Sequence, residues 1–130
     1  MATILVIDDD AGMRRTLIRM LGSDYKTIEA ENGSEGLAQF AAHSPDLVIT
    51  DIVMPIKEGI ETILELRRLS PKVRILAISG GGAEVRRADY LDMAGKLGAD
   101  ATLSKPVLAA QLRQAVQQLL SGSWAATCAP

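Results

Sequence analysis

The chain is poor in cysteine and in aromatic residues, and each shortage excludes a class of protein. Its single cysteine, Cys128, cannot form an internal disulfide, which is consistent with a reducing compartment. One Phe and one Trp leave the core to aliphatic side chains. The net charge of -2, without a basic cluster or an aromatic RNA-binding pattern, argues against nucleic acid as a partner.

Long hydrophobic runs are also missing, although the chain as a whole is apolar. No run approaches the roughly 18 residues of a membrane span, and no signal peptide precedes the first β-like run. A mean hydropathy of +0.15 with 48% hydrophobic residues excludes a disordered chain. We expect a cytoplasmic protein with no membrane partner, one folded domain over residues 1–120, and a frayed tail at 121–130.

Short β-like runs alternate with amphipathic helical stripes along the whole chain. The expected strands are residues 3–7, 26–30, 47–50, 73–78 and 101–103, and the helical stripes are 13–21, 37–41, 60–64, 88–94 and 108–119. Such βα units predict a parallel sheet with right-handed crossovers and helices on both faces. The second run alternates and suits an edge, so we expect an α/β fold, a doubly wound sheet with strand order 2-1-3-4-5.

Polar residues stand where these strands end, at the sheet edge that holds ligands in open α/β folds. Asp8 and Asp9 close the first run, Asp51 the third and Ser79 the fourth, while Lys105 follows the fifth. Asp10 is expected to cap the next helix, but capping explains only one acid. The remaining carboxylates would repel one another in a shared pocket, which predicts a hard divalent cation such as Mg²⁺.

A carboxylate, a cation site, a hydroxyl and a lysine together make a phosphoryl-transfer site. Asp51 would attack phosphorus in line and become an aspartyl-phosphate, while the metal and Lys105 absorb charge and Ser79 donates its hydroxyl. Pro106, directly after the lysine, allows a cis peptide bond that would aim the ammonium inward.

Other polar features have structural interpretations. The doublets Arg14-Arg15, Arg67-Arg68 and Arg86-Arg87 are isolated, and we interpret them as solvated helix faces. His43, the single histidine, follows a helical stripe and is expected at the surface, so a Ser79–His43–Asp triad is not expected. The run Gly80-Gly-Gly82 lacks the nucleotide-binding P-loop pattern.

The polar residues, taken in order, resemble the receiver domain of two-component response regulators over residues 2–120. The matching residues are Asp8-Asp9, Asp51, Met54-Pro55, Gly59, Ser79 and Lys105-Pro106. The resemblance implies a flavodoxin-like (βα)5 fold with Asp51 as phosphoacceptor. It implies Mg²⁺ or Mn²⁺ held by Asp9, Asp51 and the main-chain carbonyl of Val53, with Asp8 assisting through water, and contacts from Ser79 and Lys105 to the phosphoryl group.

The resemblance also implies partners and a mode of action. A histidine kinase or a histidine phosphotransfer protein would donate the phosphoryl group, and an unknown downstream protein would sense it. The chain would be a phosphoacceptor rather than a turnover enzyme. Val53 offers no amide or carboxylate to orient water, so unaided dephosphorylation is expected to be slow. We expect a stand-alone receiver or a fragment of a larger regulator.

The chain departs from the usual receiver pattern in three respects. Thr102 and Val107 stand where receivers usually carry aromatic residues, and the stretch 79–105 is longer than usual. We therefore expect output to a partner to run through the 79–105 region.

Two alternatives remain open, and a third is disfavoured. A pseudo-receiver would serve only for interaction. A haloacid-dehalogenase-type phosphatase would use Asp8 as nucleophile, in Asp8-x-Asp10. A flavin-binding module is disfavoured, because three anions stand where a phosphate needs amides and hydroxyls.

Overall fold

The structure, a computed structural model, describes residues 1–51, 56–79 and 98–121. Its strands are β1 (Thr3–Ile7), β2 (Lys26–Ala30), β3 (Leu47–Asp51), β4 (Arg74–Ser79) and β5 (Ala101–Ser104). Its helices are α1 (Ala11–Leu21), the 3-10 helix η1 (Gly22–Asp24), α2 (Gly33–His43), α3 (Ile56–Leu69) and α5 (Ala109–Ser121). No helix in the described ranges is long and apolar enough to cross a membrane.

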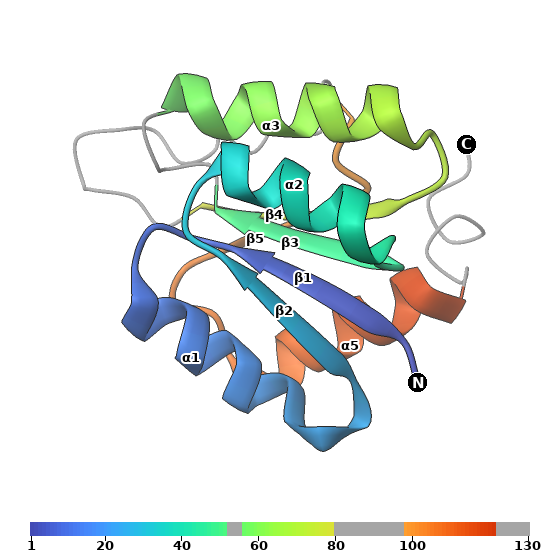
Figure 1. The fold of residues 1–130 in the computed structure, drawn as a ribbon. Helices are drawn as coiled ribbons and strands as arrows, with labels where there is room; N and C mark the ends of the chain where they lie inside the picture. The colour runs from blue at the N-terminus through green and yellow to red at the C-terminus, as the bar shows by residue number, and fades with distance from the viewer. Residues whose placement is uncertain (52–55, 80–97, 122–130) are drawn as a thin grey trace, which may run out of the picture.

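The strands form one parallel sheet in the order β2-β1-β3-β4-β5, which confirms the predicted fold class and strand order. Helices α1 and α5 lie on one face of the sheet, and α2 and α3 lie on the other (Figure 1). The predicted strand ends are confirmed to within one residue, and β3 extends through Asp51 itself. The helical stripe predicted at 88–94 lies outside the described residues.

The sheet divides an aliphatic core into two clusters. Alternate side chains of β1 enter opposite clusters: Ile4 and Val6 pack toward Leu17 and Leu112, whereas Leu5 and Ile7 pack with the core beneath α2 and α3. Strands buried on both faces read as nearly continuous apolar runs, which is why β1, β3 and β4 were recognisable.

Helix starts and ends follow local side-chain chemistry. Asp10 is the N-cap of α1, as predicted, and its carboxylate accepts hydrogen bonds from the backbone amides of Gly12 and Met13. Asn32 caps α2 in the same way through the amide of Glu35, at 2.7 Å. Asp10 lies three residues after the end of β1 and Asn32 two residues after the end of β2, so each helix starts near the sheet edge where the acids gather.

Arg67 contradicts the interpretation of its doublet as a solvated face. It is half-buried, and its guanidinium donates to the carbonyls of Val73 and Gly98 and to the carboxylate of Asp100. It thereby ties the end of α3 to the starts of β4 and β5, whereas its neighbour Arg68 is exposed. The doublet Arg86-Arg87 lies outside the described residues.

Gly36 of α2 lies in direct contact with β1. A Cβ atom there would come within 2.5 Å of Ile7 Cδ1, and Ile7 is itself fully buried, so it has little room to move. We expect Gly36→Ala to lower the free energy of unfolding by about 1–3 kcal/mol, measured by urea denaturation. The matched change Ser34→Ala, at an exposed position of the same helix, should cost about 0.5 kcal/mol or less. Equal effects of the two changes would contradict the close packing.

Candidate metal centre at the carboxyl end of the sheet

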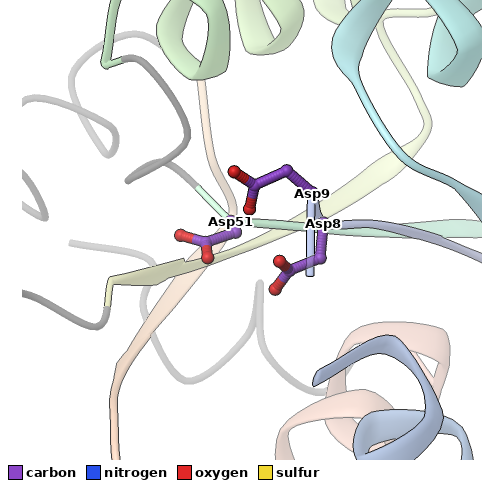
Figure 2. Close-up of side chains that lie close together, drawn as sticks. All are labelled: Asp8, Asp9 and Asp51. Carbon is purple, nitrogen blue, oxygen red and sulfur yellow. The ribbon is translucent and has the colours of Figure 1, made fainter. Parts of the chain in front are cut away.

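Three aspartates meet where β1 and β3 end. Ile7 pairs with Thr50 in the sheet register, so the next residues, Asp8 and Asp51, emerge side by side. One carboxylate oxygen from each of Asp8, Asp9 and Asp51 lies within 4.8 Å of the other two. Figure 2 shows the three carboxylates gathered at these strand ends. Asp8 and Asp51 are buried, whereas Asp9 is exposed and open to an incoming ion.

Asp8 has the most perturbed environment of the three. One of its carboxylate oxygens, Oδ1, accepts a hydrogen bond from the Asp10 amide at 2.9 Å. The other, Oδ2, is buried and has no hydrogen-bond partner within the described part of the chain. Burial, reinforced by the negative charge of Asp51, raises the pKa of Asp8 to about 7, although the Asp10 amide and Lys105 act in the opposite direction.

The donor set suits a hard divalent cation. A buried carboxylate oxygen without a hydrogen bond, beside two further carboxylates, is costly unless a positive charge is shared among them. Mg²⁺ favours one or two protein carboxylates together with waters and phosphate oxygens, and an exposed Asp9 leaves room for those. Asp8, Asp9 and Asp51 therefore fit such an ion.

Lys105 reaches this cluster from the end of the edge strand β5. It follows β5, and its Nζ donates to Asp51 Oδ2 at 2.9 Å and lies 3.9 Å from Asp8 Oδ2. The peptide bond between Lys105 and Pro106 is cis. The contacts of Nζ confirm the predicted inward direction of the lysine. Its ammonium partly offsets the negative charge of the clustered aspartates.

The remaining residues proposed from the sequence are only partly described. Ser79 is the last residue of β4, where it pairs with Ser104, so its main chain lies at the same sheet edge as the acids. Val53 lies outside the described residues. Thr102, at the position where receivers usually carry an aromatic residue, is half-buried in β5.

The interpretation of Arg14 as part of a solvated helix face is wrong. Its side chain is only 14% exposed, and its Nη1 donates to the carbonyl oxygen of Asp8 at 2.6 Å. Arg15, by contrast, is exposed as predicted. The signal was in the helical spacing: position 14 precedes the buried Leu17 and Leu21 by three and seven residues, which places it on the inward stripe.

Comparison with known proteins identifies the family. A sequence model of the response regulator receiver domain matches residues 4–117, so the chain belongs to the receiver-domain family. The CheY chemotaxis protein of Halobacterium salinarum is 33% identical over 119 residues, covering 91% of this chain and 96% of the relative. The CheY protein of Bacillus subtilis is 31% identical, covering 93% and 100%.

Longer regulators and solved receiver structures are also similar to this chain. KdpE, a transcriptional regulatory protein of Escherichia coli, is 36% identical, but the match covers only 52% of its length. A receiver domain from Clostridium thermocellum has a TM-score of 0.80 at 30% identity, covering 95% of this chain and 97% of that one. A CheY-like receiver from Methanospirillum hungatei has a TM-score of 0.83 at 25% identity, covering 94% and 95%.

The chain is therefore a receiver domain of the CheY-like response regulators of two-component systems. Its acidic cluster and inward lysine are consistent with the phosphoacceptor role of that family. Receivers of this kind are phosphoacceptors rather than turnover enzymes, bind Mg²⁺ at such a cluster, and interact with histidine kinases and downstream effectors.

The raised pKa of Asp8 predicts a pH-dependent response to Mg²⁺. The unfolded chain loses the Asp8 proton in the ordinary carboxyl range, whereas the folded, cation-free protein keeps that proton until its pKa of about 7. Rising pH over this window therefore lowers the free energy of unfolding. Mg²⁺ replaces that proton. Added Mg²⁺ should therefore raise the melting temperature more at about pH 8 than at about pH 6.

Asp8→Asn supplies the control, because the amide cannot titrate. In that variant, without cation, we expect the melting temperature no longer to fall as the pH rises through this window. Equal Mg²⁺ shifts at both pH values in the wild-type protein would show that Asp8 is not protonated in the folded, cation-free state.

Proposed function

We propose that this receiver takes a phosphoryl group onto Asp51 from a phosphohistidine donor, in the presence of Mg²⁺ or Mn²⁺, and thereby switches binding of a downstream protein. The observation that carries the proposal is the 2.9 Å contact between Lys105 Nζ and Asp51 Oδ2, inside a cluster that also holds Asp8 and Asp9. The Asp51 carboxylate is thus held beside the Lys105 ammonium and within a group of acids that could bind a metal ion.

Asp8, Asp9 and Asp51 would hold the metal, together with the main-chain carbonyl of Val53. When bound, such an ion would supply positive charge to the phosphoryl oxygens and to the attacking carboxylate. Lys105 donates to Asp51 Oδ2, and a carboxylate oxygen of Asp51 would attack phosphorus. The P–O bond forms as the P–N bond of the donor breaks, and the electron pair of that bond stays on the imidazole.

After transfer, the remaining groups act on the new phosphoryl oxygens. The Lys105 ammonium is close enough to move from the Asp51 carboxylate to a phosphoryl oxygen, and the Ser79 hydroxyl would donate to another from the end of β4. The donor would be a histidine kinase or a histidine phosphotransfer protein. His43 is exposed at the end of α2, where it has no part in this chemistry.

The phosphorylation test uses a small donor. Incubation with acetyl phosphate and Mg²⁺ should add one phosphoryl group, which peptide mass spectrometry should place on Asp51, and Asp51→Asn should abolish it. Labelling of Asp8 instead would favour the hydrolase alternative. In the same time course the label should decay slowly, since Val53 offers no group to orient water; a lifetime of only seconds would contradict that part.

The switching test follows the proposed output region, residues 79–105. Binding of beryllium fluoride, a phosphoryl mimic, with Mg²⁺ should change amide hydrogen exchange in that region of the wild-type protein. Asp51→Asn, which keeps the size of the side chain but not its charge, should show no change. A partner response that survives in Asp51→Asn would instead favour the pseudo-receiver alternative.

A further inference from the structure

Arg14 connects α1 to both the metal-binding acids and the edge strand. Its Nη1 donates to the Asp8 carbonyl at 2.6 Å, and its Nε donates to Glu29 Oε1 at 3.0 Å. The two bonds leave the guanidinium in different directions, so they set both its position and its orientation. Although α1 is a surface helix, only 14% of this side chain is exposed.

The acceptor of the shorter bond is the carbonyl of the peptide unit that joins Asp8 to Asp9. The orientation of a planar peptide determines the direction in which the next residue leaves it, so this bond acts on Asp9 through the backbone. The other side of Asp8 is held by its amide, which donates to the carbonyl of Ala30 at 3.1 Å. Arg14 therefore restrains the one peptide that carries the exposed acid of the cluster.

The Glu29 contact orients the guanidinium rather than adding much stability. Glu29 is 48% exposed, and a pair of this kind contributes little free energy by itself. Glu29 pairs with Val6 in the sheet, however, so it offers a fixed point on β2 close to the end of β1. Lysine would keep the charge at position 14 but could not reproduce the two-directional fork.

We propose that Arg14 is a positioning residue for the metal site: by holding the Asp8–Asp9 peptide from α1, it keeps the carboxylates of both residues aimed at the cation. The inference rests on the metal site of the proposed function. Outer contacts that orient metal ligands commonly change metal affinity by one to two orders of magnitude, although they never touch the ion.

Mg²⁺ affinity separates positioning from other roles. The experiment titrates Mg²⁺ into wild type, Arg14→Ala, Arg14→Lys and Arg15→Ala by calorimetry, at a temperature where circular dichroism shows each to be folded. Loss of a nearby positive charge would by itself tighten cation binding. We nevertheless expect Arg14→Ala to bind Mg²⁺ about 10-fold more weakly, because the acids lose their alignment.

The other variants complete the design. Arg15→Ala removes the same charge from an exposed position and should bind as the wild type does, and Arg14→Lys should show an intermediate loss. If Arg14→Ala binds Mg²⁺ as well as the wild type, or more tightly, Arg14 has a purely structural role and the inference fails. If Arg14→Ala does not fold, wild-type affinity in Arg14→Lys has the same meaning. A wild-type protein that binds no Mg²⁺ would instead overturn the metal site of the proposed function itself.

Discussion

The crowding of negative charge at one sheet edge is the constraint on which the rest of this structure depends. Parallel pairing of β1 and β3 brings Asp8 and Asp51 out at the same level, and both are buried there. Carboxylates so placed repel one another and lose their hydration. Lys105 and the Asp10 amide offset part of this charge, but Oδ2 of Asp8 still lacks a hydrogen-bond partner within the described residues.

That incomplete compensation makes the site responsive. A fully neutralised cluster would have little further affinity for a cation. A cluster of flexible, hydrated carboxylates would bind the cation weakly and without a defined coordination geometry. Here the uncompensated negative charge is held in place by the sheet, by the cap at the start of α1 and by the hydrogen bond from Arg14 to the Asp8 carbonyl. In the proposed function, the positive metal and the negative phosphoryl group would bind at this one site, so the same few residues would serve both.

Features with a local or periodic signal could be predicted from the sequence. Apolar runs placed the strands to within a residue, and the position of Asp8, Asp51 and Lys105 just after such runs brought them to one edge. Asp10 was recognisable as a cap because capping depends on the next two or three residues only. Each of these inferences needs only the residue and its place in an element.

The two inward arginines needed information of another kind. Arg14 and Arg67 each stand beside a second arginine that does face solvent, so charge alone does not tell the members of a doublet apart. Besides one carboxylate each, both arginines donate to main-chain carbonyls, and a carbonyl has no residue type to mark it in a sequence. Only the assembled backbone reveals such partners.

The sheet's division of the core into two separate clusters has an evolutionary consequence. The side chains beneath α1 and α5 pack together, as do those beneath α2 and α3, and the strands' backbone lies between the two sets. A substitution in one layer can be accommodated by its own neighbours without disturbing the opposite layer. Each layer can therefore accumulate substitutions independently of the other, while the strand ends that carry the acids stay in place.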